Sequence, residues 1–504
     1  MINMGVFDPV DKDTLTRDQI KKIIRSFMFL KEKFKADGSF EKLKARLVAM
    51  GNMCEGSPLE VSSPTASLQG VLMVAGIAAR ERRKVRTADV PGAYLNADML
   101  IELLMNVEPV LAGVLVHLDP KRFASFIQED GSIIVRVKKA MYGHNLSAKL
   151  WYDKLAQVLR DNGFEANTVE DCVFNKMING VQCTICLYVD DLMMTCVDDA
   201  ALDEVSEMLS KNFDGMKPSK GTVHSYLGML FDFSTDGEVK VTMEHFINEL
   251  LEKYPVDGTV NTPALTNLFD IEPSPLLSEE KRQLFHSIVA TLLYLAKRVR
   301  PDILLTVSFL ATRVSKATEN DWKRLIRVLK YLKGDPKTGI VLRPGDGPLS
   351  INASADAAYG VHEDGKSHSG LCIALGEGPI FVRSSKQKIV SKSSTEAELI
   401  SLTDGCSQII WSRDFLIGQG YEVGPAVVYQ DNMSTMAMVK SGKPTSDRTR
   451  HIHVRYFFVK DRVESGEIEI RHMDTDNMTA DFLSKPLVGA KFQKLKQKLL
   501  NWYY

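Results

Sequence analysis

The sequence has no apolar run long enough to cross a membrane. Its longest apolar runs, 68–79 and 288–296, fall short of the roughly 20 residues that a transmembrane helix needs. It also lacks a basic start followed by an apolar stretch and a small-residue cleavage site, so we do not expect secretion. Seven cysteines, an odd number spread thinly over 504 residues, indicate a reducing compartment rather than a disulfide framework.

The sequence also lacks an excess of positive charge. It has 63 Lys and Arg against 64 Asp and Glu, a formal net charge of -1, whereas nucleic-acid-binding proteins are usually basic. Positive charge is instead gathered locally, in the segments 21–46, 80–86 and 383–392. Each segment is compatible with a solvated surface or with phosphate binding. Composition alone therefore does not identify the partner.

What is present is a long chain with regular patterning. A chain of 504 residues exceeds one ordinary hydrophobic core, so about three domains are expected, and no internal repeat is visible. Apolar patterning and turn residues predict strands, helices and one apolar hairpin interrupted by acids. A Gly- and Pro-rich stretch at 334–350 predicts a domain boundary. The predicted strands are 133–137, 427–430 and 468–472, the hairpin is 181–195, and the helices are 148–160, 286–298, one beginning at Pro301, 321–333, one from Ser393 and a basic surface helix at 491–498.

The hairpin carries the sharpest motif of the first half, Tyr188-Val189-Asp190-Asp191. Two adjacent carboxylates within strand sequence are costly to bury unless something neutralises them, and a divalent metal ion would do so. A solvated turn with two acids is the alternative, and the tetrapeptide alone does not decide. Asp89 lies about a hundred residues upstream and could supply a carboxylate from a second strand. Two-metal phosphoryl transfer needs carboxylates that hold ions roughly 3.5–4 Å apart.

With these residues in view, the chain resembles the reverse transcriptase and RNase H part of copia-type retrotransposon Pol polyproteins. The resemblance runs from about Phe27 to Pro486, and the order of the motifs carries it rather than any single one. The matching segments are 44–49, 89–96, 188–191, 300–303 and 329–334, followed by 393–398 and 480–485.

The resemblance implies an α/β (α+β) fold, a right-hand polymerase followed by an RNase H-like domain. The implied division is fingers and palm at 1–230, thumb and connection helices at 231–345, the RNase H-like domain at 346–486 and a basic C-terminal tail at 487–504. The implied activity is RNA-directed DNA synthesis from dNTPs on a primed template, with cleavage of RNA in the RNA–DNA hybrid. Mg²⁺, with Mn²⁺ as a possible substitute, is the implied cofactor.

The family's polymerase roles transfer to matching positions. Asp89, Asp190 and Asp191 would hold metal and Tyr94 would exclude a ribose 2′-hydroxyl. Lys44, Arg46 and Tyr188 would contact the substrate, although exposed cations without that role remain an alternative for the first two. One departure stands out, because the family's usual Gln and Arg are replaced here by Leu146 and Lys149. Leu146 cannot hydrogen-bond, which puts nucleotide positioning in doubt.

The resemblance also implies four RNase H carboxylates: Asp356, Glu398, Asp431 and Asp481. Glu396 competes with Glu398 for the catalytic role. Ser393 followed three residues later by Glu396 forms a capping-box pattern, which gives Glu396 a structural task. We therefore expect Glu398 to face the metal.

Three weaker signals have plainer readings. Cys183 and Cys186 would point to opposite faces of a strand, so we expect core cysteines. His451 and His453 lack evident further ligands for a metal, and we interpret them as packing or nucleic-acid contacts. Asp198-Asp199 is expected to begin a helix.

Two rival functions stay open at this point: a degenerate nucleic-acid-binding relic, and a ribonuclease H with a dead polymerase half. The sequence shows no protease or integrase signature, so we expect those parts to be lost or encoded elsewhere in the element. The resemblance further implies a location in a cytoplasmic virus-like particle, with the nucleus as the alternative, and no membrane association. A dimer, or association with other element-encoded proteins, is possible.

Overall fold

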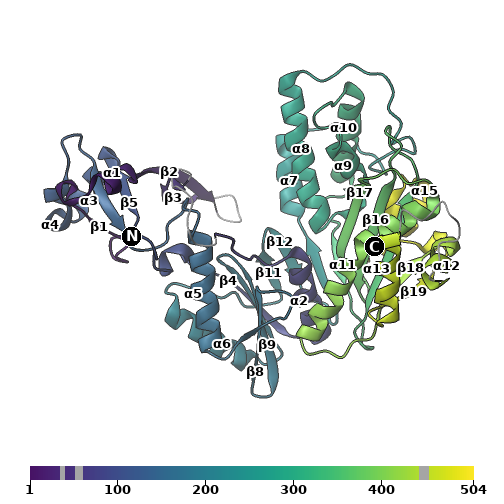
Figure 1. Ribbon diagram of the computed structural model, residues 1–504, viewed down its shortest axis with the longest axis horizontal. Helices are drawn as coiled ribbons and strands as arrows, with labels where there is room; N and C mark the ends of the chain where they lie inside the picture. Colours follow the sequence, from purple (N-terminus) through teal and green to yellow (C-terminus); the bar gives the residue numbers. More distant parts are fainter. Residues whose placement is uncertain (35–39, 52–60, 442–452, 504) are drawn as a thin grey trace.

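The computed structural model describes residues 1–34, 40–51, 61–441 and 453–503 (Figure 1). The chain forms four β-sheets, three of five strands and one of four, and β4 of the second sheet lies in sequence between β3 and β5 of the first. The N-terminal lobe lies at the left of Figure 1, the central sheet below it, and the C-terminal units at the right. Within the described ranges, no helix combines the length and the apolar character that crossing a membrane requires.

The N-terminal lobe is built on the sheet β1-β6-β5-β2-β3 and has an apolar core of its own. Its strands β2 and β3 form a long antiparallel ribbon that extends toward the central sheet (Figure 1). The predicted strand 133–137 is confirmed as β6. The elements are β1 (Phe7–Pro9), β2 (Ile24–Phe34), β3 (Phe40–Ala49), β5 (Leu104–Val107), β6 (Ile133–Val137), α1 (Arg17–Lys21), α3 (Pro109–Leu118) and α4 (Pro120–Phe123).

The central sheet has the order β4-β10-β9-β8-β7. The predicted hairpin 181–195 is confirmed as β9 and β10, and the predicted helix 148–160 as α5. The elements are β4 (Lys84–Asp89), β7 (Glu165–Ala166), β8 (Val173–Ile178), β9 (Val181–Tyr188), β10 (Asp191–Cys196), α2 (Leu68–Arg80), α5 (Ser147–Asp161) and α6 (Asp199–Asn212).

The third sheet, β11-β12-β13-β14, is completed by β14, which is separated from β13 in sequence by the four helices α7 to α10. The predicted helices 286–298 and 321–333 lie within α8 and α10, and Pro301 opens a short 3-10 turn that leads into α9. The elements are β11 (Val223–Tyr226), β12 (Met229–Asp232), β13 (Val239–Thr242), β14 (Ile340–Leu342), α7 (Glu244–Lys253), α8 (Glu279–Arg298), α9 (Leu304–Ala311) and α10 (Glu319–Gly334).

The motif at 300–303 has a structural task in this third unit. Arg300 and Asp302 are fully buried and form an ion pair of 2.8 Å. The Tyr331 hydroxyl of α10 donates a hydrogen bond of 2.7 Å to Asp302. A buried pair that lost one partner would leave an uncompensated charge, so these residues fix α10 beside the turn.

The fourth sheet, β17-β16-β15-β18-β19, is mixed: β15 is antiparallel to β16 and parallel to β18. The strands predicted at 427–430 and 468–472 are confirmed as β18 and β19, and the helix predicted from Ser393 is α11. The elements are β15 (Ile351–Ala358), β16 (His368–Leu375), β17 (Pro379–Lys386), β18 (Ala426–Gln430), β19 (Ile468–His472), α11 (Ser394–Gly418), α12 (Met433–Ser441), α13 (His453–Glu464), α14 (Asp481–Ser484) and α15 (Gly489–Leu500).

The basic C-terminal segment forms α15, which lies on the surface with one face buried. Phe492 packs against Phe482 and Tyr331, and Lys496 forms an ion pair of 2.9 Å with Asp335. The helix therefore joins the fourth unit to the end of α10.

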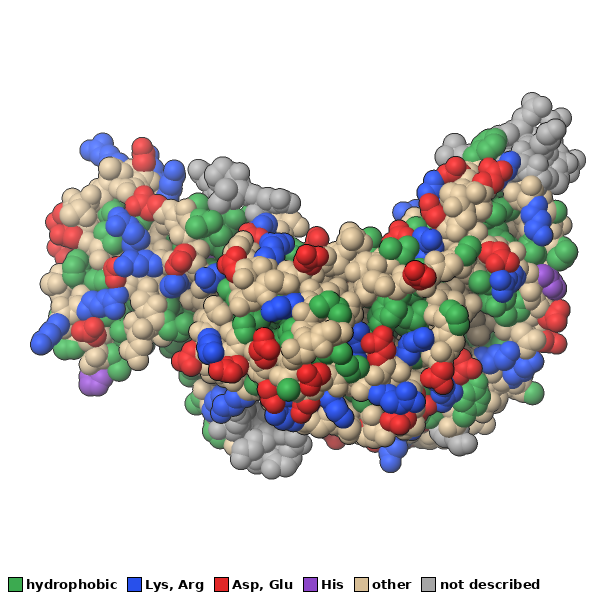
Figure 2. All heavy atoms as spheres, turned by 90° about the horizontal axis from the view of Figure 1, so that it is seen from below, with side chains coloured by type: hydrophobic (Ala, Val, Ile, Leu, Met, Phe, Trp, Pro, Cys, Tyr) green, Lys and Arg blue, Asp and Glu red, His purple; other side chains and the backbone are tan. Residues whose placement is uncertain are grey.

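One continuous apolar core links the central, third and fourth units, with members from Ala66 to Leu500. The N-terminal lobe does not share it. On the face seen in Figure 2, Lys and Arg side chains are interspersed with Asp and Glu, consistent with the balanced net charge.

Candidate functional site

Strand pairing brings the first group of carboxylates together. In β4 and β10, Asp89 stands directly opposite Asp191. Asp190 lies in the two-residue turn between β9 and β10, and its carbonyl accepts a hydrogen bond of 2.8 Å from the Val90 N–H. These three residues are called the hairpin carboxylates below. Like charges directly across a strand pair are destabilising, so a bound cation or a shared proton would stabilise this arrangement.

The turn that presents them is strained. Val189 adopts φ 57°, a left-handed conformation that a β-branched residue rarely takes. The buried Trp151 holds it there, because its Nε1 donates a hydrogen bond of 2.6 Å to the Val189 carbonyl. Trp151 belongs to α5, so a helix of the central unit fixes the shape of the turn that carries Asp190.

Burial and mutual repulsion make the hairpin carboxylates reluctant to ionise. Burial, with the Asp190 and Asp89 charges, raises the pKa of Asp191 to about 6. Burial and Asp89 also raise the pKa of Asp190, although Lys44 and Arg46 act in the opposite direction. The site therefore favours a bound cation or a shared proton.

Aromatic and basic side chains line one side of this group. Tyr94, in the turn 93–96, and Tyr142 have ring centroids 4.9 Å apart, and the Arg46 guanidinium lies 5.6 Å from the Tyr142 ring centroid. Burial and the Asp190 charge raise the pKa of Tyr94. Lys44 and Arg46 both lie on β3, opposite Lys31 and Phe29 of β2. Tyr188 is the last residue of β9, is half-buried and pairs with Asp191.

The β3 strand is anchored at the site by a close backbone approach. The Ala49 N–H donates a hydrogen bond of 2.8 Å to the Tyr142 carbonyl. Gly143 has φ 88°, and a Cβ atom there would lie 2.2 Å from the Ala49 oxygen. Only glycine fits, so the Tyr142-Gly143 segment holds the N-terminal lobe against the hairpin carboxylates.

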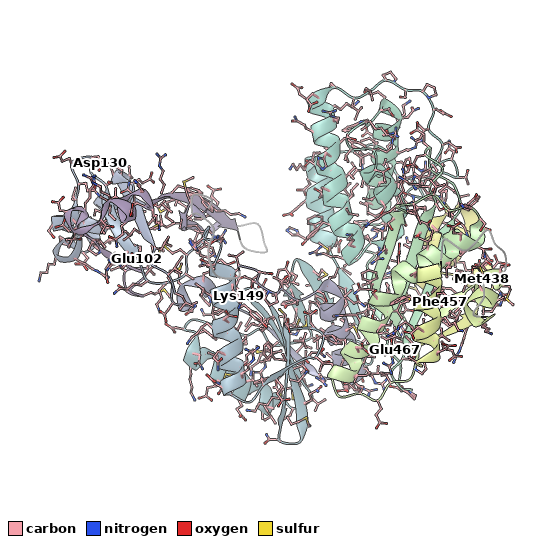
Figure 3. The ribbon with its side chains drawn as sticks, in the orientation of Figure 1. Glu102, Asp130, Lys149, Met438, Phe457 and Glu467 are labelled. Carbon is pink, nitrogen blue, oxygen red and sulfur yellow. The ribbon has the colours of Figure 1, made fainter. Side chains whose placement is uncertain are left out.

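Leu146, the departure noted in the sequence, lies in a small apolar cluster. Its side chain is 1% exposed and packs with Ala97, Ala140 and Leu150, beside Tyr94. It supports the Tyr94 turn from within rather than facing an open site. Lys149, at the N-terminal end of α5, bonds to Asp153 one turn along the helix (Figure 3).

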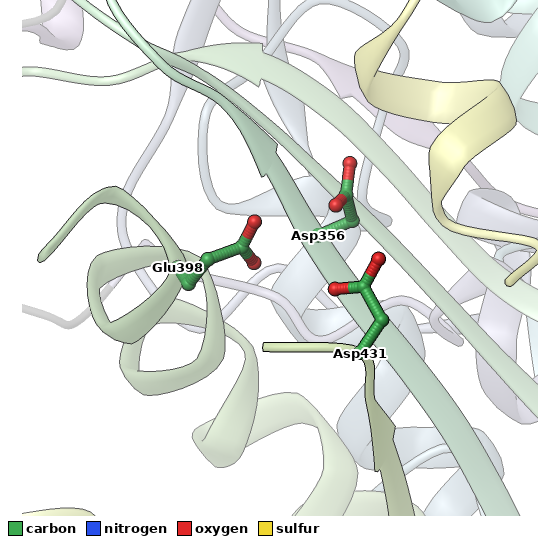
Figure 4. Close-up of side chains that lie close together, drawn as sticks. All are labelled: Asp356, Glu398 and Asp431. Atoms are coloured by element: carbon green, nitrogen blue, oxygen red, sulfur yellow. The ribbon is translucent and has the colours of Figure 1, made fainter. Parts of the chain in front are cut away.

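A second group of carboxylates gathers on the fourth sheet. Oxygen atoms of Asp356, Glu398 and Asp431 all lie within 4.8 Å of one another (Figure 4). They come from β15, from α11 and from the residue after β18, and the first two are buried. Across the described ranges, this is the one group of three or more acids, histidines or cysteines so closely spaced. These three are called the sheet carboxylates below.

Asp481, the fourth predicted acid, is linked to this group by a lysine. Lys485 forms ion pairs with Asp481 and, at 2.9 Å, with Asp356. Lys491 binds the other Asp481 oxygen at 2.8 Å. The Ser484 hydroxyl donates a hydrogen bond to the second oxygen of Asp356. Asp481 is thus adjacent to the sheet carboxylates through Lys485.

Burial dominates the electrostatics of the sheet carboxylates. It raises the pKa of Glu398 to about 9, with the charges of Asp356 and Asp431 adding to it. It also raises the pKa of Asp356, although Lys485 opposes the shift. Gln430 donates a hydrogen bond of 3.3 Å to Glu398, and Thr475 one of 2.9 Å to Asp431. These polar neighbours hold the carboxylates toward one another.

The choice between the two glutamates of α11 follows from their contacts. Ser393 caps the helix by accepting from the Glu396 N–H at 3.2 Å, as predicted. The Glu396 carboxylate accepts a hydrogen bond of 2.6 Å from the Lys392 N–H, one residue before the cap. Glu396 is therefore committed to the helix start, and Glu398 belongs to the acidic group.

The weaker predictions are also resolved where the structure describes them. Cys183 and Cys186 are buried in the core. Asp198 caps α6, Asp199 begins it, and Asp199 binds the buried Arg86 at 2.6 Å. The prediction for His451 and His453 lies outside the described side chains.

Sequence reasoning missed the side chains that support the acids. Trp151, Gln430 and Lys485 each contact a candidate site or its turn, as given above. Lys485 carried a usable signal, since it stands four residues after Asp481 in a helical segment. Trp151 and Gln430 act across elements and carried none.

Comparison with known proteins places the chain. The family model described as reverse transcriptase (RNA-dependent DNA polymerase) matches residues 15–266. The Retrovirus-related Pol polyproteins from transposons RE2 and RE1 of Arabidopsis thaliana are each 30% identical over 487 residues, covering 93% of this chain. That from transposon TNT 1-94 of Nicotiana tabacum is 27% identical over 478 residues, covering 92% of this chain. The chain spans about a third of their length, 31% of the first two and 35% of the third.

A solved structure supports the fold. The foamy viral protease-reverse transcriptase dRH in complex with double-stranded DNA aligns with a TM-score of 0.51 at 12% identity, over 94% of this chain and 68% of that one. This likeness confirms the mixed α/β polymerase-type architecture that the resemblance implied. The chain therefore belongs to the reverse transcriptase (RNA-dependent DNA polymerase) family, and its sequence is similar to part of the Pol polyproteins of copia-type retrotransposons.

Proposed function

We propose that the chain extends a primer on an RNA template with dNTPs and cleaves RNA in the resulting hybrid. The observation that carries the first half is the register of β4 and β10, which sets Asp89 opposite Asp191 beside Asp190. Family membership supports the nucleotidyl transfer, and the two carboxylate groups support a separate hydrolytic centre.

In the polymerase reaction, the hairpin carboxylates would hold divalent cations, with Mg²⁺ proposed and Mn²⁺ as a substitute. Carboxylate oxygens are the ligands that Mg²⁺ prefers, and the raised pKa values of Asp190 and Asp191 show how poorly the pair tolerates its charge alone. When bound, such ions activate the attacking hydroxyl and stabilise charge on the leaving oxygen.

The neighbouring side chains would orient the nucleotide. Lys44 and Arg46 on β3 would bind the triphosphate, because the charge of each lies close enough to Asp190 to lower the pKa of that carboxyl. Tyr94 would pack against the sugar and exclude a 2′-hydroxyl by size. Its ring contact with Tyr142 and the Leu146 cluster beneath it limit its freedom to move aside.

In the hydrolytic reaction, Asp356, Glu398 and Asp431 would hold the cations that position an attacking water on the RNA strand. Three carboxylates whose oxygens lie within 4.8 Å fit a hard divalent ion. Asp481 would join them once Lys485 releases it, since Lys485 now bridges Asp481 and Asp356.

A second candidate is a ribonuclease whose polymerase half is inactive. Leu146 favours it, because a leucine sealed in an apolar cluster offers no hydrogen bond near Tyr94. Both carboxylate groups are complete, which favours the first candidate.

Two assays on one preparation distinguish the candidates. The first is primer extension on an RNA template with Mg²⁺ or Mn²⁺, beside the Asp190→Asn/Asp191→Asn variant. The second is cleavage of a preformed hybrid, beside Glu398→Gln. Both activities in the parent, each lost in its own variant, establish the proposal. Cleavage without extension establishes the second candidate. If a folded parent shows neither activity, both candidate functions are wrong.

A further inference from the structure

The central and fourth units meet along a buried helix. In α2, every residue from Gln69 to Ala79 is buried, so the helix has no solvent-facing side. A helix that is apolar all round belongs inside a larger core. Gly76 faces the fourth sheet, where an added Cβ would lie 3.3 Å from Leu375. The two units therefore share α2 as a common layer.

The C-terminal half of α11 is fastened to the central unit by directional hydrogen bonds. Gln69 of α2 bonds to both Gln408 and Ser412 of α11. The Asn167 amide donates a hydrogen bond of 3.0 Å to the Phe415 carbonyl, and the Trp411 Nε1 donates one of 3.0 Å to the Val169 carbonyl. Buried hydrogen bonds are costly to leave unmade, so each one penalises sliding or tilting of α11.

The end of α11 fits against the central unit without spare room. A Cβ on Gly418 would lie 2.7 Å from the Thr168 hydroxyl and 2.8 Å from the Asn167 side chain. The Gln182 amide of β9 donates a hydrogen bond of 2.9 Å to the Gln419 carbonyl. The hydroxyl of Tyr421, just after α11, donates a hydrogen bond to Glu81, which forms an ion pair of 2.8 Å with Arg83 of the central unit. These contacts and those of the preceding paragraph are called the α11 seam.

The α11 seam lies between the two candidate centres. α11 is 25 residues long, about 37 Å at 1.5 Å per residue, and carries Glu398 in its second turn. Its other end is fixed to β9, the strand that leads into the turn holding Asp190. The connection between the centres thus runs through one helix and one strand within a single core.

We propose that the α11 seam is a positioning element that sets the spacing between the polymerase centre and the ribonuclease centre. Cleavage directed by a primer end would then fall at one fixed distance behind that end. This inference rests on the proposed function for its catalytic readout. The hydrogen bonds of the seam join α11 to the central unit and involve none of the hairpin or sheet carboxylates, so the seam acts through α11.

The test uses a wedge in the seam and a matched control. Gly418→Leu inserts a side chain where a Cβ already clashes, whereas Gly424→Leu adds the same atoms where nothing lies within 4 Å. Gln69→Ala with Ser412→Ala is the second variant, which removes hydrogen bonds without adding volume. Spin labels carried by unnatural amino acids at the exposed positions Lys154 and Ser465 report the distance between the units.

The substrate is an RNA template with a DNA primer whose recessed 3′ end fixes the polymerase position. We expect one narrow cluster of cuts and one narrow distance distribution in the parent and in Gly424→Leu. Both should broaden or shift in Gly418→Leu and in the double variant. Primer extension, and cleavage of a long hybrid without a nearby primer end, should stay at the parent level in all of them.

The outcomes separate this inference from the function beneath it. A broadened distance with unmoved cuts would overturn the positioning role, as would an unmoved distance with unmoved cuts. If the parent shows neither activity, the proposed function fails. The distance between the two spin labels in the parent still tests whether the spacing of the units is fixed. A narrow distribution supports a fixed spacing, and a broad one overturns it.

Discussion

The two carboxylate groups solve the same electrostatic problem in opposite ways. The hairpin carboxylates sit at a turn, with Asp89 exposed and the other two half-buried, and their nearest cations belong to a separate lobe. The sheet carboxylates are largely buried and lie beside Lys485 of the same unit. The first group depends on what binds there, whereas the second carries part of its compensation within its own fold.

The largest expected effect comes from removing either group. Asp190→Asn with Asp191→Asn should reduce primer extension on the order of 10²- to 10³-fold or more, because transition-state charge loses its support. Hybrid cleavage should be retained. Asp356→Asn should produce the reverse pattern. If either variant keeps a native circular dichroism spectrum but loses both activities, the result contradicts two independent centres.

Replacing Lys485 tests the internal compensation. Lys485→Met leaves Asp356 and Asp481 without their shared partner. We expect a loss of about 1–3 kcal/mol in the free energy of unfolding in EDTA, at the low side for a buried pair because the lysine is partly exposed. Added Mg²⁺ should restore more stability in this variant than in the parent.

The matched control for that variant is the exposed Lys498→Met, which removes a lysine on α15 away from the acids. Denaturant melts of both variants with and without Mg²⁺ provide the measurement. An equal Mg²⁺ response in the two variants contradicts a competition between Lys485 and a metal.

The raised pKa of Glu398 predicts that the free energy of unfolding depends on pH. The hairpin carboxylates should contribute only weakly to this dependence. Its pKa rises from 4.5 to about 9 on folding, so the folded state holds a proton that the unfolded chain releases. Its contribution to stability is therefore fully present below about pH 4.5 and is lost as pH rises toward 9.

In EDTA, the parent should lose on the order of a few kcal/mol between pH 5 and pH 9 relative to Glu398→Gln, which has no proton to lose. Thermal melts across that range measure the difference. Parallel stability curves for the two proteins would show that Glu398 is ionised in the metal-free fold.

The smallest effect concerns the two hairpin turns of the central sheet. Asn179-Gly180 joins β8 to β9 with positive φ at both residues, which suits this dipeptide, whereas Val189 takes φ 57° against its preference. Val189→Asn should therefore stabilise the fold by about 1 kcal/mol. Asn179→Val should destabilise it by a similar amount. Urea midpoints test both, and a destabilising Val189→Asn would refute strain at the turn.

Local patterns predicted much of the secondary structure. The hairpin 181–195 and the strands 427–430 and 468–472 were predicted because apolar runs and turn residues act over short distances. Glu398 was preferred over Glu396 because capping is also local. The domain division at 230, 345 and 486 stays a prediction. The structure adds that the third sheet draws β14 from beyond α10 and that α15 packs against that helix.

Other features could not be predicted from local sequence. Leu146 replaces a glutamine that the resemblance places near the nucleotide, and its side chain packs in an apolar cluster with Ala97, which is far from it in sequence. Asp481 was expected among the sheet carboxylates, and the structure shows that it pairs with Lys491 and reaches Asp356 through the shared partner Lys485. Each outcome depends on which distant side chains compete for the same space or charge.

The sequence by itself determined the family, the order of the motifs and the acids available for chemistry, because these are properties of residues and their spacing. Tertiary structure alone decided which acids meet, how each is neutralised, and that α11 ties the two centres together. Burial, ion pairing and close packing join residues hundreds of positions apart, as Gln69 and Ser412 show. Such contacts have no signature in local periodicity, since their free energy exists only once the chain has folded.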